Sequence, residues 1–150
     1  MDVPTFERMV QNNEFCEWAR VHGNLYGTHV DELERAKREN KKGLLFDVDY
    51  QGARQIKAKF AHAISVFILP PSMQELRRRL ESRGQDAPES IEIRFAKAAE
   101  EIEHYPFFDY IVVNNDLQQA LTELRSIVIA QRCRQSRRAS AAEALLDRKR

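Results

Sequence analysis

The chain has 150 residues, a formal net charge of +1, 43% hydrophobic residues and 31% charged residues, which is the composition of a soluble globular domain with its own core. No apolar run approaches the roughly 20 residues of a membrane-spanning helix, and the N-terminal MDVPTFERMV lacks the basic and apolar regions of a secretory signal. Because Cys16 and Cys133 are isolated, without metal-binding spacing, we expect reduced thiols in a cytoplasmic protein.

The first 40 residues predict a small lobe of loops, short strands and helices. A short helix around residues 4–12 leads into EFCEWARVHGNLYGT (14–28). Thr28 and Asp31 have the spacing of a capping box that would begin a helix in HVDELERAKREN. No repeat or low-complexity linker separates this lobe from the residues that follow it.

Three polar side chains of this lobe are candidates for ligand recognition. Glu17, Tyr26 and Thr28 lie among aromatic residues. A carboxylate can accept two hydrogen bonds from the N1–H and N2–H₂ groups of guanine, a pattern that adenine does not offer, and Tyr or Thr hydroxyls can bind a phosphate oxygen. The alternative is a structural role, in which Phe15 and Trp18 are core residues rather than groups that stack on a base.

Beyond residue 42, β-branched or aromatic runs alternate with helical patterns. The runs LLFDVD (44–49), ISVFILP (64–70) and YIVVNN (110–115) are apolar on both faces, as is typical of buried parallel strands. Apolar spacing, with caps at Ser72 and Asp116, predicts helices at 50–60, 72–83, 88–105 and from 117 onward. This order indicates an α/β fold, a parallel sheet with helices on both faces, joined to the small lobe.

Two carboxylates stand at the end of the first of these runs. Asp47 and Asp49 would share one face of a strand, roughly 6.5–7 Å apart, and would repel each other. The carboxyl ends of parallel strands bind ligands, and an Asp there can organise Mg²⁺ through water or accept hydrogen bonds from a base or sugar. Alternatively, Asp49 caps the helix that begins at Tyr50. D-x-D at a strand end also occurs in phosphoaspartyl enzymes, but residues 70–72 (PPS) match their phosphate loop poorly.

Arginines mark the region after the second run. Arg79 and Arg83 are four residues apart on one predicted helix, Gly84 follows, and Arg94 lies on the next helix. Because the guanidinium fork suits phosphate, a hinged helix of this kind can close over a polyphosphate. The alternative is a solvated face, since Arg77 belongs to the same run of arginines and Glu residues lie nearby.

The last predicted helix carries an apolar stripe formed by Leu117, Leu121, Leu124 and Val128. Residues 125–150 contain eight Lys or Arg against two Asp or Glu. Their final stretch, RQSRRASAAEALLDRKR, lacks the interleaved aromatic residues of a nucleic-acid-binding segment. We therefore interpret this stretch as a basic, solvated helical tail.

Taken in order, these segments resemble the guanylate kinase family, enzymes that transfer a phosphoryl group from ATP to GMP. EFCEWARVHGNLYGT, LLFDVDYQGARQIK, FILPPSMQELRRRLESRGQD and YIVVNND occur in the family's order with similar spacing and cover most of residues 3–130. None of the five glycines begins the phosphate-binding motif G-x-x-x-x-G-K-[ST], and Asn115 stands where the family often has Asp. The resemblance thus implies a guanylate kinase-like fold without roughly its first third, which in the family carries this motif and an arginine-bearing T-T-R-x-P-R segment.

The resemblance also implies which residues bind GMP. Glu17 and Asp49 would recognise guanine, and Tyr26 and Thr28 would hold the GMP phosphate. These four residues form the implied substrate-binding set.

A second set is implied for phosphoryl transfer and ATP. Asp47 would lie near the magnesium ion and the transfer centre, and Arg83 and Arg94 would contact the transferring phosphates. Arg79 and Asn114 would lie toward ATP. ATP and Mg²⁺ are the implied cofactors, and no residue is assigned as a direct metal ligand.

We therefore predict a partial GMP-binding lobe at 1–42, the core and lid at 43–133, and the basic tail at 134–150. The predicted function is ATP-dependent phosphorylation of GMP to GDP, impaired here because the phosphate-binding motif is lacking. Loss of a central strand should also expose apolar sheet surface. GMP and ATP are the expected partners, with no membrane or specific nucleic acid, and oligomerisation stays open. Two alternatives remain: a non-catalytic guanylate-kinase-like module that binds GMP or a phosphorylated partner, and a phosphoaspartyl phosphatase.

Overall fold

The chain forms two units of short strands and helices, which we call the N-terminal unit (Met1–Ser65) and the C-terminal unit (Val66–Arg150). The computed structural model describes residues 1–21, 23–82 and 87–146. Each unit contains a two-stranded sheet, and the fold is mixed α/β. The predicted divisions after residues 42 and 133 stay predictions.

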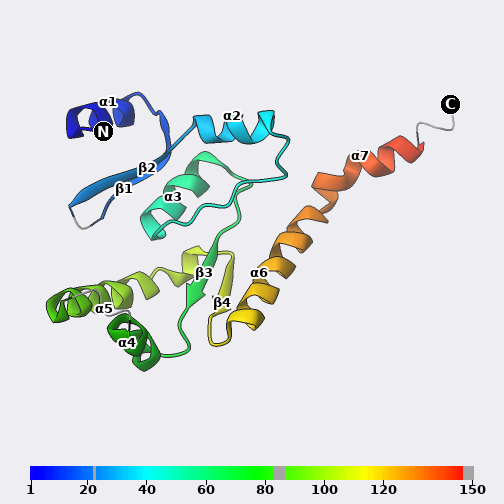
Figure 1. Ribbon diagram of the computed structural model, residues 1–150. Helices are drawn as coiled ribbons and strands as arrows, with labels where there is room; N and C mark the ends of the chain where they lie inside the picture. The colour runs from blue at the N-terminus through cyan, green and yellow to red at the C-terminus, as the bar shows by residue number, and fades with distance from the viewer. Residues whose placement is uncertain (22, 83–86, 147–150) are drawn as a thin grey trace. The chain divides into compact units, whose positions relative to one another are not determined.

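The elements of both units are coloured in chain order in Figure 1. The N-terminal unit contains α1 (Val3–Gln11), β1 (Phe15–Val21), β2 (Asn24–His29), α2 (Asp31–Arg38) and α3 (Tyr50–Lys59). The C-terminal unit contains β3 (Val66–Leu69), α4 (Met73–Ser82), α5 (Pro88–Ile102), the 3-10 turn η1 (Tyr105–Phe107), β4 (Tyr110–Val113), α6 (Leu117–Arg132) and α7 (Gln135–Leu146). Within the part of the chain that the structure describes, no helix has the length and apolar character needed to cross a membrane.

The N-terminal unit is built on an antiparallel hairpin of β1 and β2, with α1 and α3 packed on β1 (Figure 1). Phe6 of α1 stacks on Phe15 of β1 with ring centroids 4.5 Å apart. Cys16, the next residue of β1, is fully buried. The predicted helix at 50–60 is confirmed as α3, and its apolar side, Ala53 and Ile56, is buried.

Residues 44–49 correct one prediction. This run was expected to be a buried strand, but it has no regular secondary structure, and Leu45 is 94% exposed. A strand forms only where a neighbouring strand supplies hydrogen-bonding partners. Among the described residues no strand pairs with this run, so its apolar character alone does not make it a strand.

The predicted capping box of Thr28 and Asp31 is also wrong. Thr28 belongs to β2, and its hydroxyl donates to Glu17 instead of to the start of α2. The residue before α2, Val30, makes no side-chain capping bond, and the Asp31 N–H donates to Nδ1 of His29 at 3.1 Å. The imidazole therefore takes the place that the sequence pattern assigned to a hydroxyl.

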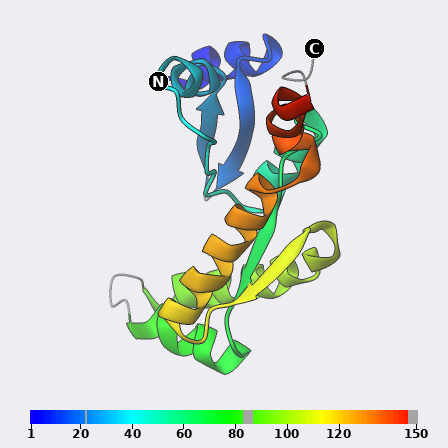
Figure 2. The same ribbon diagram turned by 90° about the vertical axis from the view of Figure 1, so that its right-hand side faces the viewer.

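In the C-terminal unit, β3 and β4 form the predicted parallel pair, in register from Val66 opposite Tyr110 to Leu69 opposite Val113. Figure 2 shows the two strands side by side, with α6 next to β4. Gln131 of α6 donates to the Tyr110 hydroxyl at 2.8 Å. The predicted helix after Asp116 is confirmed as α6, which Asp116 caps.

The apolar stripe predicted for α6 is only partly covered. Leu117 is 61% exposed and Val128 is 54% exposed. A sheet of two strands is narrower than a helix of this length, so the ends of the stripe have no apolar surface of this sheet to cover them.

Both predicted helix caps of the C-terminal unit are confirmed. Ser72 accepts the Glu75 N–H at 3.1 Å, and Asp116 accepts the Gln119 N–H at 2.8 Å.

Candidate functional site

Glu17 of β1 is a buried carboxylate, with 6% of its surface exposed. Thr28 lies opposite it in the hairpin register and donates its hydroxyl proton to Oε1 of Glu17 at 2.6 Å. Burying a carboxylate is unfavourable unless hydrogen bonds compensate for the lost water. The hairpin therefore supplies the partner that keeps Glu17 in place.

Asp49 caps α3 and lies on the same turn that Glu17 approaches. Its Oδ1 accepts the N–H groups of Gln51 at 3.0 Å and Gly52 at 3.1 Å. Oε2 of Glu17 lies 3.1 Å from the position that a Cβ atom would take at Gly52. Both carboxylates thus reach the first turn of α3, whose N–H groups have no acceptor within the helix itself and carry partial positive charge.

Glycine at position 52 makes this approach possible. A Cβ atom there would lie 2.9 Å from Cβ of Val48 as well as against the Glu17 carboxylate. Any larger residue would displace one or both of them. Gly52 is therefore part of the site, although it offers no side chain.

Tyr26 and Asp47 are the more exposed candidates of the N-terminal unit. Tyr26 is 58% exposed and lies two residues before Thr28, so the two side chains share one face of β2. Asp47 is exposed and lies in the irregular run before α3. Because that run is not a strand, the expectation that Asp47 and Asp49 share a strand face is wrong: Asp49 is a helix cap and Asp47 precedes it in irregular chain.

In the C-terminal unit, the structure brings Arg79 and Asn114 together. Nη1 of Arg79 donates to the backbone oxygen of Asn114 at 2.9 Å, and its Nε donates to Glu75 at 2.7 Å. Hydrogen bonds from Arg78 and Arg79 lower the pKa of Glu75 to about 2. This carboxylate therefore stays charged and holds Arg79 toward Asn114.

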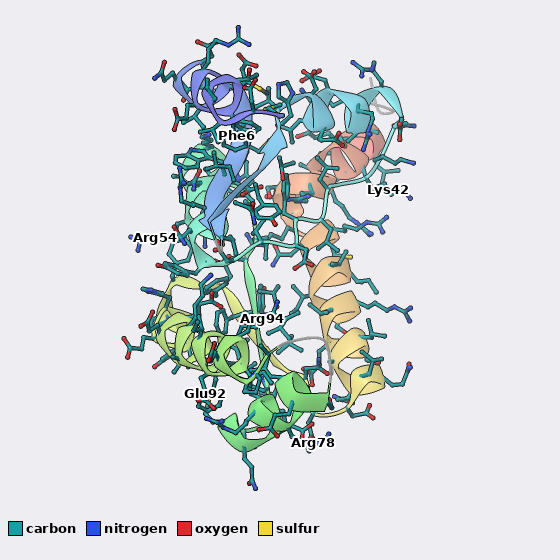
Figure 3. All side chains as sticks on the ribbon, turned by 60° about the vertical axis from the view of Figure 1, so that its left-hand side comes forward. Phe6, Lys42, Arg54, Arg78, Glu92 and Arg94 are labelled. Carbon is teal, nitrogen blue, oxygen red and sulfur yellow. The ribbon has the colours of Figure 1, made fainter. Side chains whose placement is uncertain are left out.

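The two remaining arginine candidates are Arg83 and Arg94. Arg94 lies on α5, half-buried, on the same helix as Glu92 (Figure 3). Arg83 lies outside the described residues.

Sequence reasoning missed two residues that fix β1 to α3. The side-chain amide of Gln55 donates to the Trp18 oxygen at 2.6 Å and accepts the Trp18 N–H at 3.1 Å. Nζ of Lys59 donates to the Phe15 oxygen at 2.6 Å. With Gly52 they follow the spacing i, i+3, i+7 along one side of α3, which was the available signal.

The described residues offer no ready-made metal centre. Within residues 1–21, 23–82 and 87–146 there is no group of three or more His, Cys, Asp or Glu side chains that could hold a metal ion. Both cysteines are free thiols, and burial raises the pKa of Cys16, which favours its neutral form.

Hydrogen-bond acceptors are concentrated around the first turn of α3. Two carboxylates converge on one helix terminus, and hydroxyl groups lie on the adjacent hairpin. Acceptors concentrated in this way suit a ligand that presents several N–H groups on one edge.

Comparison with known proteins identifies the family. The profile of the guanylate kinase family matches residues 2–131, and the chain belongs to this family. It is 48% identical over 132 residues to the guanylate kinase of Geobacter sulfurreducens, covering 88% of this chain and 64% of that protein. It is 44% identical over 138 residues to the guanylate kinase of Myxococcus xanthus, covering 91% of this chain and 66% of that protein.

A solved structure gives the same result for the fold. The crystal structure of guanylate kinase from Anaplasma phagocytophilum superimposes with a TM-score of 0.72 at 33% sequence identity, covering 91% of this chain and 66% of that chain. This chain therefore spans slightly less than two thirds of the length of these relatives.

Proposed function

We propose that the chain provides the GMP-binding site of a guanylate kinase, in which Glu17 and Asp49 recognise guanine. The observation that carries the proposal is the approach of both carboxylates to the first turn of α3. Guanine presents N1–H and N2–H₂ donors on one edge, whereas adenine presents an unprotonated N1 acceptor there. Carboxylates accept from the first base and repel the second.

The hydroxyl groups take different parts in this proposal. A threonine hydroxyl has one proton, and that of Thr28 is donated to Glu17. Thr28 therefore orients Glu17 and can meet phosphate only by giving up this bond. Tyr26, exposed on the same face of β2, is the direct contact for the GMP phosphate.

The reaction that we propose is phosphorylation of GMP by ATP. Mg²⁺ takes carboxylate oxygens, commonly one or two, together with water and substrate phosphates, so Asp47 fits such a role. When bound, the ion neutralises phosphate charge. Arg83 and Arg94 would contact the transferring phosphates, and Arg79, oriented by Glu75, would face ATP near Asn114. The sequence lacks the phosphate-binding motif G-x-x-x-x-G-K-[ST], so we expect these residues alone to phosphorylate GMP slowly or not at all. The cytoplasm is the proposed location of the protein.

We further propose that β3 and β4 belong to a larger parallel sheet covered on both faces. Ile111 and Val113 share one face of β4 and are 45% and 46% exposed, and Ile68 of β3 is 53% exposed. Apolar side chains of this kind are buried in complete parallel sheets. The exposed Leu45 in the irregular run before α3 has the same character.

Isothermal titration with GMP, and with AMP as the comparison ligand, tests the base assignment. Asp49→Asn is the most informative variant, because asparagine caps a helix as well as aspartate does but places an NH₂ group or a neutral oxygen where guanine needs a charged acceptor. We expect GMP affinity to fall about tenfold or more, which corresponds to about 1.4 kcal/mol, with an unchanged unfolding temperature.

The matched control is Glu34→Gln, an exposed carboxylate of α2 that pairs with Lys37. It should leave GMP affinity unchanged. Equal or tighter binding of AMP by the native chain would contradict the assignment of Glu17 and Asp49 to guanine.

A further inference from the structure

The relation between β1 and α3 decides where the two carboxylates of the proposed site stand. Glu17 belongs to the strand and Asp49 to the start of the helix. Their separation is therefore set by whatever fixes the strand to the helix. The contacts between the two elements are polar as well as apolar, and they lie on three successive turns of α3.

Gln55 makes the central contact. Its amide bonds both the N–H and the oxygen of Trp18, as a neighbouring strand would. Trp18 pairs with Gly27 in the hairpin register, so β2 lies along one edge of β1 and Gln55 occupies the other. A bidentate contact to the backbone fixes the strand along its axis, which apolar packing alone does not do.

The contacts on either side of Gln55 point the same way. One turn earlier, Gly52 receives the Glu17 carboxylate. One turn later, Lys59 donates to the Phe15 oxygen. Gln55 bonds the residue directly after Glu17, so a shift at Trp18 moves Glu17 with it.

We infer that Gln55 is a positioning residue for guanine recognition, which holds β1 in register against α3 so that Glu17 and Asp49 accept from the same base. This inference rests on the proposed GMP site. It assigns no contact between Gln55 and the nucleotide. Lys59 supports the same register from the far end of the helix.

The preference of the chain for GMP over a purine nucleotide with fewer donors tests the positioning role of Gln55. The variant Gln55→Met keeps the length and the helix propensity of the side chain but removes both hydrogen bonds. Titration with GMP and with IMP, which lacks the 2-amino group, gives a ratio of affinities that is independent of the folded fraction. IMP makes fewer bonds to the carboxylates and depends less on their spacing, so we expect the GMP-to-IMP ratio to fall about tenfold. Lys59→Met should lower it by less.

Arg54→Met is the matched control, because Arg54 precedes Gln55 on α3 and is exposed (Figure 3). It should leave the ratio unchanged. A native ratio in Gln55→Met would overturn the inference while leaving the GMP site intact.

A second measurement needs no nucleotide. In the free protein, Gln55→Met should speed hydrogen exchange at the Trp18 amide and shift the ¹³C resonance of the Glu17 carboxyl, whereas Arg54→Met should do neither. If the native chain binds no GMP, the proposed function fails by that result alone. An unchanged Glu17 resonance in Gln55→Met would then overturn the positioning role on its own.

Discussion

The two units use their apolar residues in different ways. The N-terminal unit buries Phe6, Phe15, Cys16, Ala19, Ala53 and Ile56. In the described part of the C-terminal unit the buried apolar residues are Val112 and Ala120, while strand residues such as Ile111 and Val113 stay almost half exposed. The first unit thus has a compact core around its hairpin, and the second has apolar faces that are only partly covered.

Ion pairs connect the helices of the C-terminal unit instead. Arg77 of α4 bonds Glu92 of α5 in a bidentate pair and lies 4.3 Å from the centroid of the Phe95 ring. Exposed pairs of this kind contribute little to stability and weaken with salt. The comparison teaches that the proposed guanine-binding carboxylates belong to a unit with a packed apolar core. The contact between the arginine-rich helices α4 and α5, in contrast, includes exposed ion pairs that salt screens.

The largest expected effect comes from removing the aromatic core of the N-terminal unit. Phe15→Ala deletes the ring that stacks on Phe6, and such truncations of buried aromatics cost about 3–5 kcal/mol. Hydrogen exchange followed by mass spectrometry should show faster exchange of the backbone amides of β1, β2 and α3, with the exchange rates of β3 and β4 unchanged. Equal loss of protection in both units would show that the comparison is wrong.

A smaller effect is expected from the bond between Thr28 and Glu17. Thr28→Val keeps the shape of the side chain but leaves a buried carboxylate without its donor, which costs about 1–3 kcal/mol. Chemical denaturation measures this loss. Thr28→Ser keeps the hydroxyl and serves as the control. If the valine variant is as stable as the serine variant, the bond does not stabilise the buried carboxylate.

Much of the helical structure was predictable because its signals are local. Asp49, Ser72 and Asp116 cap α3, α4 and α6 as their positions in the sequence indicate. A cap involves residues within one turn, so no knowledge of the tertiary fold is needed. The run 44–49 has strand-forming residues, but strand pairing depends on a distant partner, and the prediction failed there.

In the candidate site, too, the local features were predictable from the sequence and the long-range contacts were not. Glu17, Thr28 and Asp49 could be singled out from the sequence and its resemblance to a family, and the structure brings their side chains to neighbouring positions. The bond between Thr28 and Glu17 was not predictable, since it depends on the hairpin register. Gln55 was missed for a similar reason: a polar residue on a helix looks the same in sequence whether it faces water or a strand.

The exposed face of β4 provides a third prediction, which sharpens the contrast between the units. Ile111→Thr combined with Val113→Thr should lower binding of the dye ANS and reduce self-association, because two exposed apolar side chains become polar. Threonine is a good strand residue, so the cost in stability should be within about 1 kcal/mol. Fluorescence titration and sedimentation velocity measure these changes. Undiminished ANS binding would mean that this face is not the exposed apolar surface of the unit.

The smallest expected effect concerns the charge pairs of α4. Bonds from Arg78 and Arg79 hold the pKa of Glu75 at about 2, below its ordinary 4.5. A carboxylate with a lowered pKa in the folded state stabilises that state above its ordinary pKa, and this contribution is lost as the pH falls toward the folded value. At neutral pH the amides of α4 should therefore be better protected from hydrogen exchange in the native chain than in the variant Glu75→Gln. This difference in protection should disappear as the pH falls from 4.5 to about 2. High salt, about 1 M, should shrink the difference at neutral pH as well, because it screens exposed charges. A difference that persists at low pH and high salt would assign the effect of Glu75 to packing, and the C-terminal unit would then resemble the N-terminal unit more closely than its ion pairs indicate.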